Sequence, residues 1–191
     1  MIGENRMPIA KRIRAAAVTS KRVRPRMVGL SAGVTIATAA LLGTVVAPAQ
    51  AYSPNPSASI SYRDTDNCTC TLSDPFDGTY FQYDAGGYAA KIELRDASGS
   101  YISKVEFHPY DEKLWVYDTK NDGDSVYVSV YWWDASGNPH AVGPNITPTG
   151  TDAVVDYVVY NLDIAEGTPV SIDVYDGSGY SDYITSAEVV A

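Results

Sequence analysis

The sequence predicts an all-β protein, an antiparallel two-sheet sandwich of about eight or nine strands that follows a helical secretion signal. From Ser57 onward, apolar and polar residues alternate, and turn residues recur about every eight to twelve positions. No segment of that region repeats apolar residues at helical spacing over about three turns. Val, Tyr, Thr and Ile, which favour strands, dominate the alternating segments.

The first 51 residues have the organisation of a secretory signal peptide. A basic region, 6–26, precedes an apolar run, 27–46, and small residues follow at alternate positions. Signal peptidase requires such residues, so we expect cleavage after Ala51, with Ala49 and Ala51 recognised. The alternative is an uncleaved anchor, because about 20 apolar residues can span a bilayer. The processing site and the abundance of Ala, Gly and Thr favour cleavage, and therefore an extracellular protein without stable membrane insertion.

Charge is divided unequally between the leader and the remaining chain. Residues 1–51 hold eight of the 14 Lys and Arg residues and one of the 23 acidic residues, so residues 52–191 retain six basic and 22 acidic residues, a net charge of −16. All 15 tyrosines and all three tryptophans also lie in residues 52–191. Nucleic acids and anionic membranes are therefore poor partners, because phosphate binding requires clustered Lys and Arg.

Residues 52–191 are expected to form one domain. Within it, 90–95 alternates strictly, with Ile92 and Leu94 on one face and charged residues on the other. The connection 96–99 predicts a hairpin, and a second hairpin is expected around Gly123, which can adopt positive φ. The expected strands are 57–63, 79–83, 90–95, 100–107, 113–118, 125–133, 153–162, 170–175 and 183–190.

Three strands are followed by similar acidic turns, at 96–99, 134–137 and 176–179. Each has Asp first, Ser third and Gly fourth. These turns could be three equivalent ligand loops. We favour ordinary turn chemistry, because Asp and Ser satisfy local backbone groups and Gly accepts a left-handed conformation.

Three segments, 108–112, 116–123 and 160–168, resemble small secreted β-proteins of streptomycetes and their relatives. The resemblance covers residues 107–174, about half of the expected domain. It implies a secreted β-sandwich and carries no established activity. The leader is also similar in style to those of actinobacteria.

The two cysteines, Cys68 and Cys70, stand two positions apart. Secretion favours their oxidation. On a strand their Cα atoms would be about 6.5 Å apart, at the outer limit for a disulfide. A local disulfide is the favoured interpretation, and intermolecular pairing and thiol exchange are the alternatives. Exchange enzymes usually place such a pair at a helix N-terminus, which this sequence does not predict.

Calcium is the one cofactor that the sequence suggests, because clustered carboxylates in turns supply the oxygen ligands that Ca²⁺ prefers. The segment 118–124 does not match an EF-hand, since Lys120 stands at a ligand position and Ser129 where the bidentate Glu belongs. The alternative is a solvated Asp/Asn-Gly turn. The candidate ligands are Asp118, Asn121, Asp122 and Asp124.

The segment 126–133 has aromatic residues on one of its two faces. Val126, Val128, Val130 and Trp132 share one face, and Tyr127, Ser129, Tyr131 and Trp133 share the other. If the second face is exposed, Tyr127, Tyr131 and Trp133 form a stripe suited to stacking on sugar rings. The alternative is a central strand covered on both faces, with 138–150 as the covering loop.

Catalysis finds little support in the sequence. His108 and His140 each lie beside a proline and belong to no recognisable nucleophile or metal motif. Paired carboxylates for glycoside hydrolysis remain open, because their spacing in space cannot be read from the sequence. We therefore expect a secreted, non-enzymatic binding protein whose partner is a polysaccharide or another extracellular protein. The alternatives are a carbohydrate-binding module, a calcium-stabilised extracellular structural protein and an enzyme.

Overall fold

The computed structural model describes residues 51–148 and 155–191, and these ranges contain eleven strands and no helix. Paired strands are antiparallel, which confirms the predicted all-β, antiparallel fold. Except for Ala51, the predicted secretion signal lies outside the described residues. Within these ranges, no helix could cross a membrane. The strands are β1 (Ser57–Asp64), β2 (Cys70–Leu72), β3 (Thr79–Phe81), β4 (Tyr88–Arg95), β5 (Tyr101–His108), β6 (Lys113–Asp118), β7 (Tyr127–Trp133), β8 (Pro139–Ile146), β9 (Asp156–Asn161), β10 (Pro169–Gly177) and β11 (Ser181–Val190).

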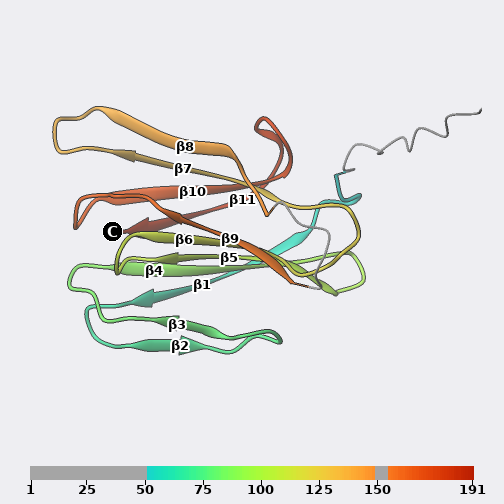
Figure 1. Ribbon diagram of the computed structural model, residues 1–191, viewed down its shortest axis with the longest axis horizontal. Helices are drawn as coiled ribbons and strands as arrows, with labels where there is room; N and C mark the ends of the chain where they lie inside the picture. The colour runs from blue at the N-terminus through green and yellow to red at the C-terminus, as the bar shows by residue number, and fades with distance from the viewer. Residues whose placement is uncertain (1–50, 149–154) are drawn as a thin grey trace, which may run out of the picture. The chain divides into compact units, whose positions relative to one another are not determined.

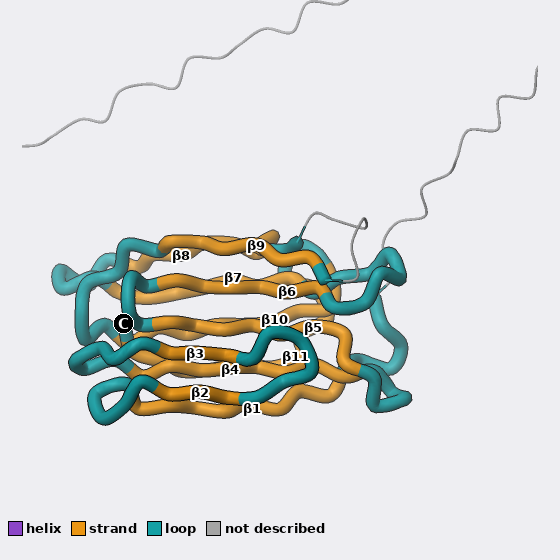
Figure 2. Tube along the Cα trace, turned by 60° about the horizontal axis from the view of Figure 1, so that its bottom comes forward, coloured by secondary structure: helices purple, strands orange, loops and turns teal. Residues whose placement is uncertain are grey.

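Nine strands belong to one continuous sheet that is nearly closed into a barrel (Figures 1 and 2). Their order is β8-β7-β10-β11-β4-β5-β6-β9, and β1 also pairs with β4. β11 and β4 are joined by one residue pair, Val190 with Tyr88. A four-stranded part (β8, β7, β10, β11) and a five-stranded part (β1, β4, β5, β6, β9) therefore enclose one core. The sequence predicted two separate sheets, whereas this pair links them.

Alternation along the strands places apolar residues in the core. Val128 and Val130 of β7 and Phe107 of β5 are fully buried. In two strands, the row of core-facing side chains ends with an aspartate. In β6, Leu114 and Val116 are followed by Asp118, and in β10, Ile172 and Val174 are followed by Asp176. Both aspartates are buried.

The hairpin of β2 and β3 forms a second, two-stranded sheet that lies over the outer side of β4 and β5 (Figure 2). Phe81 of β3 packs against Cys70 and Ala89, and all three are buried. The Thr79 hydroxyl donates a hydrogen bond of 2.5 Å to Glu106 on β5. We call the outer side of β4 and β5 the covered face.

The structure corrects two local predictions. The hairpin at 96–99 is confirmed, because β4 pairs with β5. The hairpin around Gly123 is wrong, since β6 pairs with β5 and β9 while β7 pairs with β8 and β10. Gly123 does have positive φ, but its loop carries the chain between the two parts of the sheet. The segment expected as a covering loop contains β8, and the short strand β2 was missed.

Candidate functional site

The aromatic stripe on β7 lies on the outer side of the four-stranded part. Trp133 is 62% exposed, and Tyr127 and Tyr131 are half-buried. β8 lies beside β7 in the sheet, so the described part of 138–150 does not cover this stripe. The opposite side of β7 is buried in the core, as the alternation predicted. We call the outer side of β7, β10 and the β10–β11 turn the open face.

More tyrosines join the stripe from β10, from the turn after it and from the start of β11. The Tyr175 ring makes edge contacts with the rings of Tyr180 and Tyr183, at centroid distances of 5.7 and 5.8 Å. Tyr180 and Tyr183 are exposed. In the strand register, Tyr175 stands opposite Tyr127 and Asp173 stands opposite Ser129. These residues could not be predicted from the sequence, because only the pairing of β7 with β10 brings them beside the stripe.

Polar groups lie between these rings. The Tyr175 hydroxyl donates to Asp173 at 3.2 Å, and the Tyr131 hydroxyl donates to Ser129 at 3.3 Å. Burial raises the pKa of Asp173, although the Tyr175 hydrogen bond opposes this shift. Hydrogen bonding with Tyr131 raises the pKa of Tyr180. The open face therefore combines flat apolar rings with hydroxyl and carboxylate groups.

A second aromatic cluster lies on the outer side of β6 and β9. The Trp115 ring stacks on Tyr157 at a centroid distance of 5.6 Å, and Tyr157 is 59% exposed. The Tyr117 ring lies 5.5 Å from Tyr157, and its hydroxyl donates to Asp77 at 3.2 Å. A hollow of about 430 Å³ adjoins this cluster, lined by Pro75, Phe76, Asp77, Tyr117, Val155 and Tyr157. This cluster was not predicted from the sequence, because it depends on the pairing of β6 with β9.

The covered face contains charges in place of an aromatic stripe. The Lys104 side chain has no exposed surface, and its Nζ lies 2.9 Å from Asp74, 2.5 Å from Asp77 and 2.9 Å from Glu106. Burial opposes ionisation of Asp74, but hydrogen bonds from Lys104 and from two backbone amides lower its pKa to about 2. Because each of these charges has partners, the cluster serves to hold the hairpin loop on β5.

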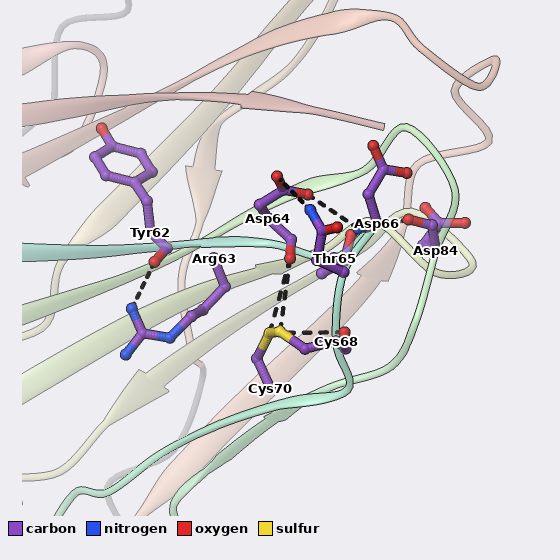
Figure 3. The surroundings of a disulfide bond; sticks show 9 residues. Tyr62, Arg63, Asp64, Thr65, Asp66, Cys68, Cys70 and Asp84 are labelled. Carbon is purple, nitrogen blue, oxygen red and sulfur yellow. Dashed lines mark hydrogen bonds between the residues drawn. A yellow bond between two sulfur atoms is a disulfide. The ribbon is translucent and has the colours of Figure 1, made fainter.

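The structure joins Cys68 and Cys70 in a disulfide with Cα atoms 5.3 Å apart (Figure 3). Cys68 precedes β2, so the pair does not lie on one regular strand, and the separation is shorter than the strand estimate. The Asp64 carbonyl oxygen lies 3.6 Å from the Cys68 sulfur and 3.9 Å from the Cys70 sulfur. The two cysteines are paired with each other, which leaves no free thiol in the chain for exchange.

The first aspartate of each of the three similar acidic turns differs in its hydrogen bonds and burial. Asp96 accepts hydrogen bonds from the backbone amides of Ser98 and Ser100 at 2.9 and 3.0 Å. Asp134 accepts the same two bonds from its own turn, at 2.9 and 2.8 Å. Asp176 instead points inward and is 1% exposed. Within the described residues, neither of its carboxylate oxygens has a hydrogen-bond partner of acceptable geometry.

Three of the four predicted calcium ligands have protein contacts, and Asp124 lies close enough to Asp176 for its charge to raise the pKa of that carboxyl. Asp118 accepts the Lys120 amide at 3.0 Å, Asp122 pairs with the Lys120 ammonium at 3.2 Å, and Asp124 accepts the Ser125 amide at 2.9 Å. Burial is the main cause that raises the pKa of Asp118 to about 6. In the ranges the structure describes, no group of three or more acidic, His or Cys side chains is arranged to hold a metal ion. Calcium binding by Asp118, Asn121, Asp122 and Asp124 stays a prediction.

Both histidines pair with a carboxylate and an aromatic ring. The His108 ring nitrogen lies 3.0 Å from Glu106, and the His140 ring nitrogen lies 3.1 Å from Asp134. His108 contacts Phe81 edge-on, and His140 stacks on Trp132. Contacts of this kind are typical of histidines with a structural role.

Carboxylates do gather around a polar hollow of about 430 Å³ lined by Asp111, Glu112, Lys113, Asn161 and Asp163. Burial, followed by the nearby charges of Glu166 and Asp84, raises the pKa of Glu112. The Lys113 ammonium pairs with Asp111 at 2.8 Å. This arrangement alone defines no reaction.

Comparisons with protein-family models, with curated proteins and with solved structures each found no match.

Proposed function

We propose that the protein is a secreted, non-enzymatic binding protein built on a nearly closed, barrel-like β-sheet, and that its open face binds an uncharged polysaccharide. The observation that carries this proposal is the exposure of Trp133 at the end of a row of rings on β7. Exposed aromatic rings gathered on one surface are typical of binding sites. Secretion is supported by the basic region, the apolar run and the small residues before Tyr52.

The shape and chemistry of the open face favour a glycan chain over a compact ligand. Tyr127 and Trp133 are six residues apart on one strand, which corresponds to about 20 Å. Rings along that length can stack on successive sugar rings, while Asp173 and the tyrosine hydroxyls can accept hydrogen bonds from sugar hydroxyls. The net charge of −16 on residues 52–191 disfavours an anionic polymer.

The test is retention of the protein on insoluble chitin, cellulose and peptidoglycan. We expect retention on chitin or cellulose, which are uncharged, and a loss of about tenfold or more in affinity for Trp133→Ala and Tyr131→Ala. Retention on peptidoglycan alone, whose peptides carry carboxylates, would contradict the uncharged ligand. The matched controls are Trp115→Ala and Tyr157→Ala in the second aromatic cluster, which should bind as the unchanged protein does. Failure to bind all three glycans would exclude the proposal. Loss of binding in the control variants alone would move the site to the second cluster.

A further inference from the structure

The Asp176 carboxylate lacks the partner that its burial requires. Its two counterparts, Asp96 and Asp134, are satisfied by hydrogen bonds that lower the pKa of each. The main donors are the Ser98 hydroxyl and the Lys120 ammonium for Asp96, and the side-chain and backbone amides of Asn138 for Asp134. Burial, followed by the charges of Asp124 and Asp182, raises the pKa of Asp176 to about 7. A buried carboxylate without a partner is strongly unfavourable when ionised. A positive group beside Asp176 would remove this penalty.

Tyr52 is anchored at the same end of the barrel. Its ring packs against the core, and its hydroxyl donates to Asp122 at 3.3 Å. The Lys120 ammonium lies over the ring, 5.9 Å from its centroid. The backbone N–H of Tyr52 lies near enough to Asp176 to lower the pKa of that carboxyl, without reaching the geometry of a good hydrogen bond.

Tyr52 is also the residue that directly follows the predicted cleavage site. Ala51 is exposed, whereas Tyr52 is half-buried. Asn55 extends the anchoring, because its amide donates to Asp182 on β11 at 2.8 Å. Among the described residues, the segment before β1 is therefore anchored on the domain from the residue that would become the first of the processed chain.

We propose that cleavage after Ala51 creates an α-ammonium group on Tyr52 that forms a buried ion pair with the Asp176 carboxylate, so that removal of the leader completes the fold. This proposal rests on the predicted secretion and cleavage. Hydrolysis adds one water across the Ala51–Tyr52 bond. The C–N bond breaks, the water oxygen joins the Ala51 carboxylate, and both water hydrogens end on the Tyr52 nitrogen, which becomes an ammonium group.

The surrounding charges favour this ammonium group. A free α-amino group has a pKa of about 8, and adjacent carboxylates stabilise its charged form. The acidic groups at this end are Asp118, Asp122, Asp124, Asp176 and Asp182, and the nearby cation Lys120 is already paired with Asp96 and Asp122. A new positive charge at Tyr52 therefore meets an excess of negative charge.

The experiment compares the full-length precursor with the processed protein produced from it by secretion, after N-terminal sequencing of the latter. We expect the processed form to melt about 5 °C or more above the precursor near pH 7.5. We also expect Asp176→Asn to raise the melting temperature of the precursor, by removing an unpaired charge, and to lower that of the processed form. Asp134→Asn, in the similar turn between β7 and β8, is the control and should shift both forms equally, because Asp134 contacts its own turn and His140 only.

Equal shifts of both forms by Asp176→Asn would overturn the proposal, as would a first residue other than Tyr52. An equal rise in the melting temperature of both forms on adding Ca²⁺, abolished by Asp176→Asn, would also overturn it by assigning a metal ion to the carboxylate. If Asp176→Asn does not fold, the rate of acylation of the Tyr52 α-amine in the processed protein tests the proposal instead. We expect this amine to react about tenfold or more slowly than the α-amine of a peptide of residues 52–56. Equal rates would overturn the proposal. Glycan retention tests the binding function separately.

Discussion

The covered face and the open face lie on the outer sides of the two parts of one sheet, and they use alternating strands in different ways. On the covered face, the outward residues of β4 and β5 include Lys91, Lys104 and Glu106, all buried beneath the β2–β3 hairpin. On the open face, the outward residues of β7 include Tyr131 and Trp133, which retain exposure. Charged residues are thus buried where a hairpin covers them, and aromatic residues are exposed where no described strand does. Residue type along a strand does not by itself indicate which side meets solvent.

The largest expected effect is on the covered face, where Lys104→Ala should lower the free energy of unfolding by about 3–5 kcal/mol. The substitution leaves Asp74, Asp77 and Glu106 facing one another without their shared cation. Denaturant titration measures the change. Lys113→Ala, which removes an exposed ion pair with Asp111, should cost less than about 1 kcal/mol. Similar losses for both variants would mean that the hairpin does not bury the Lys104 charge.

The two faces should also respond oppositely to pH. The pKa of Asp74 is about 2 in the folded protein and about 3.9 in an unfolded chain, so its contribution to stability is complete above about pH 4 and is lost as the pH falls toward 2. On the open face, burial raises the pKa of Asp173, so ionisation is less favourable in the folded protein than in the unfolded chain. The contribution of Asp173 to the free energy of unfolding therefore declines as the pH rises above about 4.

Unfolding titrations between pH 2 and pH 7 measure these slopes. Asp74→Asn should remove about 2 kcal/mol of the stability lost on acidification. Asp173→Asn is the open-face counterpart and should reduce the decline that begins near pH 4. If the loss of stability on acidification is the same in Asp74→Asn as in the unchanged protein, the ion pair of Asp74 with Lys104 does not stabilise the fold.

The smallest effect on stability is expected on the open face, where Trp133→Ala should change the free energy of unfolding by less than about 0.5 kcal/mol. Its ring is largely exposed, so truncation leaves no cavity. The adjacent Trp132 faces the core, and Trp132→Ala should cost about 3–5 kcal/mol. A large loss of stability in Trp133→Ala would show that the open face is packed against another part of the chain.

Local periodicity predicts which side of a strand a residue lies on, but it does not predict which strands pair. Alternation correctly separated Val128 and Val130 from Tyr127 and Tyr131, because the two sides of a strand follow from backbone geometry alone. The hairpin expected at Gly123 was wrong, because a Gly-containing turn permits reversal without choosing the partner strand. Tyr175 and Asp173 could not be placed beside the stripe, since register between β7 and β10 depends on contacts distant in the sequence.

By itself, the sequence determined the all-β, antiparallel class, the two sides of 90–95 and 126–133, and the acidic, aromatic character of residues 52–191. These properties follow from local periodicity and composition. Only the tertiary structure decided that Lys104 is buried, that Trp133 is exposed, and that Asp176 departs from two turns of similar sequence. The physical reason is that solvation depends on what packs above a side chain. That neighbour comes from a distant segment, as the β2–β3 hairpin does for Lys104.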